Sequence, residues 1–149
     1  MITESFLPHV NGVSTSVQRV CEHLALRGHD ALVVTPGHGP EAFAGFPVVR
    51  ALSIPAPGYR EFRLGTVYPH LGSVLRAYEP DVVHLASPVT LGAQGAWTAH
   101  RLGIPSVSVF QTELAGFALS GSAHAAVQNR SWAVLGDQLL EHYSVVRAA

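Results

Sequence analysis

The fold is decided by the stretch from residue 69 to residue 110, which reads PHLGSVLRAYEPDVVHLASPVTLGAQGAWTAHRLGIPSVSVF. At its centre, Asp81–Leu85 is a short apolar run bounded by turn signals, which predicts a buried strand. Apolar residues at helical spacing predict a helix on each side, over 69–78 and 91–102. A further apolar run over 105–110 predicts the next strand. This alternation is typical of a parallel sheet that helices cover on both faces.

The same alternation continues toward the amino terminus. The elements predicted there are, in chain order, a strand over 2–6, a helix from Val13 to Gly28, a strand over 31–35, a strand over 47–52 and a loop over 53–63. Right-handed crossovers place the first strand in the centre and give the strand order 3-2-1-4-5. The expected fold class is therefore α/β, with a Rossmann-like, doubly wound parallel sheet.

Length and composition exclude several classes of function. The chain has 149 residues and a formal net charge of −1, which predicts one domain and argues against bulk binding to nucleic acid. Its 9 basic residues are all arginines, which excludes a P-loop lysine, a Schiff base and a lysine general base. With 13% charged and 48% hydrophobic residues, the domain has too little charge to cover its own surface. We therefore expect part of that surface to be covered.

Cysteine and histidine usage bears on metal sites and compartment. Cys21 is the single cysteine, so neither an internal disulfide nor a cysteine-rich zinc site is expected. The 9 histidines form no H-x-x-x-H or H-E-x-x-H pair, and no metal is expected. The chain has neither a run of 18 apolar residues nor a basic leader after Met1, so the expected compartment is the cytoplasm.

The turn between the first strand and the first helix is the most informative motif. It reads Pro8-His-Val-Asn-Gly-Val-Ser14, and the N–H groups and dipole of a helix that follows a parallel strand favour an anion such as phosphate. The phosphate-binding residues predicted here are His9, Asn11, Gly12 and Val13, with Gly12 allowing close approach to the backbone. The alternative is an Asn-Gly turn that only caps the helix, with His9 as a surface residue.

This turn lacks the G-x-G-x-x-G fingerprint of dinucleotide-binding domains. A similar spacing occurs at Gly37-His-Gly-Pro-Glu-Ala42, after the second strand. Because Pro40 interrupts it and no long helix follows, the sequence predicts a loop there rather than a nucleotide site.

Further polar residues are expected at the carboxyl ends of the strands, where doubly wound sheets bind their ligands. His84 lies near the end of a strand, although a core histidine is an equal alternative. The other residues predicted for the cleft are Gln111, Thr112 and Glu113 after the last strand, and Tyr59, Arg60 and Arg63 on the preceding loop. For the two arginines, a solvated loop is the alternative to binding a phosphate or carboxylate.

The pattern changes after Gln111. Residues 112–126 are rich in Ala, Gly and Ser, which is typical of a flexible connector. The chain closes with an amphipathic helix from Ser131 to Arg147. Its apolar stripe consists of Trp132, Leu135, Leu139, Tyr143 and Val146. Because such a stripe is too apolar for solvent, we expect the helix to dock on the domain, either within a monomer or exchanged in a dimer.

Four motifs carry a family resemblance. They are, in order, residues 3–13 (TESFLPHVNGV), 58–63 (GYREFR), 80–88 (PDVVHLASP) and 109–117 (VFQTELAGF). Together they resemble the N-terminal domain of retaining glycosyltransferases of family 4, which have the GT-B fold. The resemblance covers residues 1–119 and is strongest to actinobacterial GDP-mannose-dependent α-mannosyltransferases that act on lipid-linked acceptors.

The resemblance implies α-mannosyl transfer from GDP-mannose to a glycolipid acceptor in cell-envelope synthesis. The nucleotide sugar is then a substrate, with no separate cofactor, and the full enzyme would be peripheral to the inner face of the plasma membrane. The turn over 9–13 would meet donor phosphate, and the cleft residues named above would line the acceptor side. Gln111 stands where many relatives have a histidine. The resemblance therefore assigns no catalytic residue.

The resemblance also implies that this chain lacks one of the two domains of the family's enzymes. Family members have a second Rossmann-like domain that binds the nucleotide sugar, and no segment of this chain resembles it. We therefore expect an acceptor-side domain over 1–119, a connector over 120–124 that replaces the donor domain, and the family's last helix over 125–149. Such a fragment is expected to be inactive alone. Two other classes stay open: an isolated binding or scaffold module, and an unrelated doubly wound nucleotide-binding protein.

Overall fold

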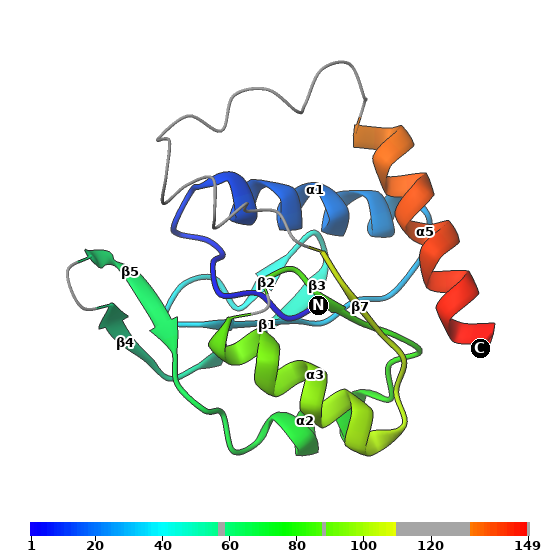
Figure 1. Ribbon diagram of the computed structural model, residues 1–149. Helices are drawn as coiled ribbons and strands as arrows, with labels where there is room; N and C mark the ends of the chain where they lie inside the picture. Colours follow the sequence, from blue (N-terminus) through cyan, green and yellow to red (C-terminus); the bar gives the residue numbers. More distant parts are fainter. Residues whose placement is uncertain (57–58, 88, 110–131, 149) are drawn as a thin grey trace, which may run out of the picture.

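The computed structural model describes residues 1–56, 59–87, 89–109 and 132–148, with the backbone alone at 54–56, 59–65 and 132. The helices are α1 (Gly12–Leu26), α2 (Leu71–Tyr78), α3 (Thr90–Leu102) and α5 (Trp132–Ala148). The strands are β1 (Val33–Pro36), β2 (Ala42–Phe43), β3 (Phe46–Ala51), β4 (Ser53–Ala56), β5 (Tyr59–Gly65), β6 (Val83–Leu85) and β7 (Ser106–Ser108). The central strands lie between α1 on one side and α2 with α3 on the other (Figure 1). The domain is thus mixed α/β.

The central strands pair mainly in parallel. β1 lies parallel to β3, and β6 lies parallel to β7. Ile2 lies between these two pairs and forms parallel bridges to Val34 of β1 and Leu85 of β6. β2 pairs with β3 in antiparallel orientation. Among these strands, the neighbours follow the order expected from right-handed crossovers, with the start of the chain in the centre.

The first strand is shorter than expected. The prediction of a strand over 2–6 is wrong, because only Ile2 forms bridges. The Thr3 N–H still donates to the Val34 oxygen at 3.0 Å. The Thr3 hydroxyl, however, donates to the Ser5 oxygen at 3.0 Å and accepts from the Ser5 N–H at 3.3 Å. This local pairing competes with the strand ladder, so the chain leaves the sheet after Thr3.

The prediction of a loop over 53–63 is also wrong. β4 and β5 form an antiparallel hairpin in which Pro55 lies opposite Arg63. The register shifts between Pro55 and Ala56, and such an irregularity accommodates a proline, which has no N–H for the ladder. The proline in this segment therefore marks an irregular hairpin.

Buried apolar residues form two clusters on opposite faces of the central strands. The cluster toward α2 and α3 includes Ile2, Val34, Leu71, Leu75, Leu85 and Leu91. The cluster toward α1 includes Phe6, Val17, Cys21, Leu24, Val33 and Val48. The central strands are therefore covered on both faces, as the continuous apolar runs of the sequence predict.

α5 lies beside α1 (Figure 1). Leu140 and Tyr143 pack on the cluster toward α1. Gly136 lies so close to α1 that a Cβ added there would be 2.6 Å from the His23 ring. Of the stripe predicted for this helix, Tyr143 contacts the core, but Leu140 rather than Leu139 joins it. The sequence pattern missed this because a glycine, which permits the close approach, carries no apolar signal.

Polar contacts join both ends of α5 to the rest of the domain. Asp137 shares a hydrogen bond with His23 at 3.1 Å and accepts another from Arg27. Arg147 pairs with Asp81 at 3.0 Å. Since the Arg27 and Arg147 pairs are exposed, they orient the helix more than they stabilise it. The connector predicted over 120–124 lies outside the described residues.

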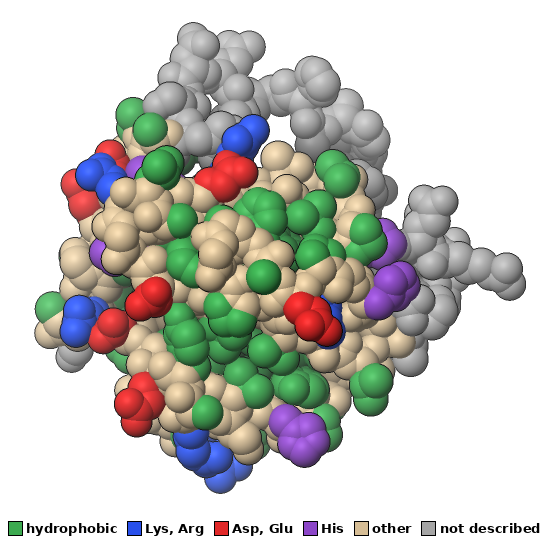
Figure 2. Space-filling view, turned by 180° about the vertical axis from the view of Figure 1, so that it is seen from behind, with side chains coloured by type: hydrophobic (Ala, Val, Ile, Leu, Met, Phe, Trp, Pro, Cys, Tyr) green, Lys and Arg blue, Asp and Glu red, His purple; other side chains and the backbone are tan. Residues whose placement is uncertain are grey.

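The surface is poor in charge, as the composition indicates. Figure 2 shows a face on which hydrophobic side chains occupy a broad area and charged side chains are sparse. Large apolar side chains are exposed at several places, among them Val10, Leu26, Leu52, Val67 and Trp97. Within the described ranges, no helix is both long and apolar enough to cross a bilayer.

Candidate functional site

Asn11 organises the turn before α1. Its side-chain oxygen accepts a hydrogen bond from the Ser14 N–H, and the Ser14 hydroxyl accepts one from the Asn11 N–H, both at 2.9 Å. This reciprocal capping box fixes the start of the helix. The Asn11 amide nitrogen also donates to the Ser5 hydroxyl at 2.6 Å. The Asn11 side chain therefore shapes the turn, which is the role that the capping alternative assigns to it.

Gly12 begins α1 and faces open space. A Cβ added there meets no heavy atom within 4 Å, and the residue is not in the left-handed region. Neither packing nor conformation therefore requires a glycine. The capping box uses the N–H of Ser14, so the N–H groups of Gly12 and Val13 point out of the helix N-terminus. An anion there would meet both groups and the positive end of the helix dipole. His9 is exposed on the same turn.

Arg50, which the sequence patterns did not single out, holds this turn in place. Its guanidinium donates to the carbonyl oxygens of Leu7 at 2.9 Å and of Pro40 at 2.8 Å. Burial lowers the pKa of Arg50. Gly39 approaches the same turn so closely that an added Cβ would lie 2.5 Å from the Leu7 oxygen. The loop over 37–42 thus packs against the candidate phosphate turn.

A buried carboxylate, also missed from the sequence, lies at the start of α3. Glu4 is 4% exposed, and its carboxylate accepts hydrogen bonds from the Leu91 N–H and, at 3.3 Å, from the Gly92 N–H. The positive end of the α3 dipole favours a carboxylate at this position. The signal in the sequence is an acidic residue inside a strand that is predicted to be buried, because acids are almost never buried without partners.

His84 lies beneath α5 rather than at an open edge. It is 3% exposed, and its Nδ1 shares a hydrogen bond with the Tyr143 hydroxyl at 2.5 Å. Its Nε2 has no partner among the residues that the structure describes. Burial lowers the pKa of His84 to about 3 and raises the pKa of Tyr143. His84 is therefore neutral at physiological pH, in the environment of a core histidine.

Because His84 is buried and neutral, we expect the stability of the folded protein to fall in acid. Its folded pKa is about 3 and its ordinary value is 6.5, so below pH 6.5 the unfolded state binds a proton that the folded state excludes. Stability is complete above pH 6.5 and falls toward pH 3, by about 1.4 kcal/mol per pH unit for this group. Urea midpoints between pH 7 and pH 4.5 measure the slope. We expect a shallower slope in His84→Gln, and parallel curves would exclude His84 as the cause.

The other predicted cleft residues are only partly located. Tyr59, Arg60 and Arg63 lie on β5, of which the structure describes the backbone. Gln111, Thr112 and Glu113 lie outside the described residues. The geometry of the site is therefore given by the turn before α1 and its supporting residues.

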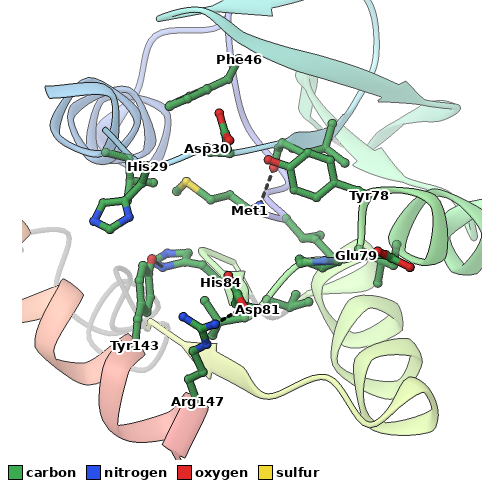
Figure 3. Close-up of a pocket in the computed structure, with 18 of the residues that line it drawn as sticks. Met1, His29, Asp30, Phe46, Tyr78, Glu79, Asp81, His84, Tyr143 and Arg147 are labelled. Carbon is green, nitrogen blue, oxygen red and sulfur yellow. Dashed lines mark hydrogen bonds and ion pairs between the residues drawn. The ribbon is translucent and has the colours of Figure 1, made fainter. Parts of the chain in front are cut away.

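A cavity of about 1010 Å³ opens at the opposite end of the central strands from this turn. Residues that precede β1 and β6 line it, together with the carboxyl-terminal ends of α1, α2 and α5 (Figure 3). Doubly wound domains bind ligands at the carboxyl ends of their strands, whereas this cavity lies at the amino ends. In the part of the chain described here, no three His, Cys, Asp or Glu side chains are grouped as metal ligands.

Similarity to known proteins is extensive. The family model of Glycosyltransferase Family 4 matches residues 10–143. The GDP-mannose-dependent alpha-mannosyltransferase of Corynebacterium glutamicum is 45% identical over 122 residues, which cover 78% of this chain and 30% of that protein. The protein of the same name in Mycolicibacterium smegmatis is 48% identical over 126 residues, which cover 80% and 34%. The alpha-monoglucosyldiacylglycerol synthase of Acholeplasma laidlawii is 31% identical over 115 residues, which cover 75% and 29%.

The chain spans about a third of the length of these relatives. No solved structure matches it. The family match and the identities confirm the resemblance that the four sequence motifs carry. The chain belongs to glycosyltransferase family 4.

Proposed function

We propose that this chain is the acceptor-side half of a retaining α-mannosyltransferase that transfers mannose from GDP-mannose to a glycolipid. In this proposal residues 1–119 form the doubly wound N-terminal domain of a GT-B enzyme, residues 120–124 replace the donor domain, and residues 125–149 return to the first domain. The complete enzyme would work at the cytoplasmic face of a membrane. No metal ion or separate cofactor takes part.

One observation carries the proposal. Two proteins whose names state GDP-mannose-dependent α-mannosyl transfer are 45% and 48% identical to this chain. A glycolipid acceptor is supported by a more distant relative whose name states synthesis of a glucosyldiacylglycerol. Since the chain spans about a third of each relative, the proposal assigns it one side of a cleft that needs two.

The proposed chemistry depends on positioning and charge. The departing diphosphate of the donor would meet the outward N–H groups of Gly12 and Val13, with His9 beside them on the turn. The acceptor hydroxyl would attack from the same face, and the leaving phosphate would help to take its proton. Because the two substrates must be held in one orientation, binding by both halves supplies much of the rate enhancement.

The acceptor side is proposed from the sequence motifs. Its residues are Tyr59, Arg60, Arg63, Gln111, Thr112 and Glu113. Two guanidinium groups beside a phenol suit a polar headgroup that carries phosphate or several hydroxyls. His84, held by Tyr143 beneath α5, would not touch the acceptor.

Turnover by the chain alone tests the proposal. We expect no transfer from radiolabelled GDP-mannose to a mannosylated glycolipid, and less than about 1% of the rate of the two-domain relative, because the donor-binding face is missing. The relative from Corynebacterium glutamicum, assayed beside it, is the positive control. Adding the isolated donor-binding half of that relative should restore measurable transfer. A rate near that of the relative without this addition would overturn the fragment proposal.

A further inference from the structure

Arg50 of β3 joins two loops at the carboxyl edge of the central strands. One of its terminal nitrogens, Nη2, donates to the Leu7 oxygen, directly ahead of the turn before α1, at 2.9 Å. The same nitrogen donates to the Pro40 oxygen at 2.8 Å, and Nε donates to that oxygen at 3.3 Å. The loop over 37–42 follows β1, which neighbours the start of the chain. One guanidinium therefore connects this loop to the turn before α1.

The two loops also pack too closely for a side chain at Gly39. A Cβ there would lie 2.5 Å from the Leu7 oxygen, 2.7 Å from the Arg50 guanidinium and 2.8 Å from the Pro8 ring. The φ angle of Gly39 is 151°. The contact between the loops and the hydrogen bonds of Arg50 thus meet at the same carbonyl group.

Other hydrogen bonds that shape the turn run within it. The His9 N–H donates to the Phe6 oxygen at 3.1 Å, and the Asn11 amide nitrogen donates to the Ser5 hydroxyl at 2.6 Å. Such local bonds fix the form of the turn but not its place on the sheet. Arg50 supplies a point of attachment from a different strand.

Arg50 also brings a positive charge to this turn. Within the described ranges, its guanidinium forms no ion pair, whereas Arg19 and Arg27 pair with Glu22 and Asp137. Its partners described above are carbonyl oxygens. The charge therefore adds to the field of the α1 dipole that an anion at the start of α1 would meet.

We propose that Arg50 is a positioning residue for the diphosphate of the nucleotide sugar, an inference that rests on the phosphate-binding role proposed for Gly12 and Val13. Arg50 acts through the Leu7 carbonyl, which it holds so that the two N–H groups are in place before the anion binds. Donors that are placed in advance need no reorganisation when the anion arrives. A lysine would keep the charge but lacks the planar fork of donors that joins the two loops.

Two substitutions separate the attachment from the charge. Arg50→Lys keeps the charge, and Arg50→Gln removes both. The full chain is titrated with inorganic diphosphate at constant ionic strength, and the amide shifts of Gly12 and Val13 give the affinity. We expect binding to weaken about threefold in Arg50→Lys and about tenfold or more in Arg50→Gln. The matched control is Arg19→Gln on the exposed surface of α1, which should change the affinity by less than about twofold.

Amide exchange without ligand measures the attachment itself. The Ser14 N–H donates to the Asn11 side chain, so its exchange reports the turn. We expect exchange at Ser14 to quicken about tenfold in both Arg50 variants, with a smaller change at Val34 in the core. A general loss of stability would instead quicken both amides alike. If Arg50→Gln does not fold, Arg50→Lys alone decides through its affinity and its exchange at Ser14.

Three results would overturn the proposal. They are equal diphosphate affinity in Arg50→Gln and the unsubstituted chain, affinity and exchange in Arg50→Lys equal to those of the unsubstituted chain, and absence of diphosphate shifts at Gly12 and Val13 in the unsubstituted chain. The second result would leave a role for charge alone. Transfer restored by the donor-binding half tests the proposed function separately, so the two can fail independently.

Discussion

A chain truncated after Ser120 is expected to aggregate or to be largely unfolded at room temperature. The truncation removes Leu140 and Tyr143, which pack on the cluster toward α1, and uncovers the apolar surface around them. Each large buried apolar side chain contributes about 1.5–3 kcal/mol, within a typical stability of about 5–15 kcal/mol. We therefore expect a loss of about 5 kcal/mol. Urea unfolding and size-exclusion chromatography measure it.

Point variants separate the role of the apolar contact from the effect of shortening the chain. Leu140→Ala combined with Tyr143→Ala should reproduce most of the loss in the full-length chain. Val145→Ala is the matched control, because Val145 is 68% exposed on the same helix. Its effect should stay within about 0.5 kcal/mol. If the truncated chain keeps its melting temperature and solubility, α5 does not stabilise the domain.

Gly92→Ala is the second change with a large expected effect. A Cβ at Gly92 would lie 1.9 Å from the carbonyl oxygen of Ser87, and a backbone atom cannot move aside as a flexible side chain can. The first turn of α3 would have to shift, and the Glu4 carboxylate would lose N–H donors that it uses while buried. We expect a loss of about 3 kcal/mol or more in the free energy of unfolding.

The matched control is Gly72→Ala in α2. An added Cβ there meets Arg76 at 3.6 Å and Thr98 at 3.7 Å, which are ordinary contacts. Alanine is the better helix former, so Gly72→Ala should be neutral or stabilise by up to about 1 kcal/mol. Chemical denaturation of both variants measures their free energies of unfolding. Similar stability of the two would show that α3 does not meet Ser87 as described.

The helices and central strands follow from sequence patterns because each carries a strong local signal. Gly28, where the first predicted helix ends, and Gly103, which follows the helix predicted over 91–102, have φ angles of 73° and 68° in the left-handed region. Asp81–Leu85 has three apolar residues among five and is bounded by turn signals, and its last three residues form the buried strand β6. Local pattern and tertiary burial agree at these places.

The sequence patterns failed where contacts between distant segments decide the structure. The Thr3 hydroxyl ends the first strand through bonds to Ser5, which apolar periodicity does not register. Gly136 brings α5 against His23 by having no side chain.

At the candidate site, too, sequence patterns predict local features but not contacts between distant segments. Gly12 was predicted as a phosphate-binding residue because a helix N-terminus after a strand has a physical signature, and the structure places it at the start of α1. Arg50 and Glu4 were not predicted, since their partners at Leu7 and at the start of α3 lie far from them in the sequence. Pairing across such separations depends on the topology, which a local pattern does not contain.

Binding of the diphosphate of GDP-mannose at the first turn of α1 can be measured directly. Backbone amide NMR of the full chain, titrated with GDP-mannose and with mannose alone, locates the binding. We predict weak binding, on the order of millimolar, with the largest shifts at Gly12, Val13 and Ser14 and no response to mannose. Gly12→Val should keep the fold, since an added Cβ meets nothing within 4 Å, and should lose these shifts because the side chain blocks the helix end. Shifts confined to other residues, or shifts at this turn that Gly12→Val leaves unchanged, would show that the diphosphate does not bind at the start of α1.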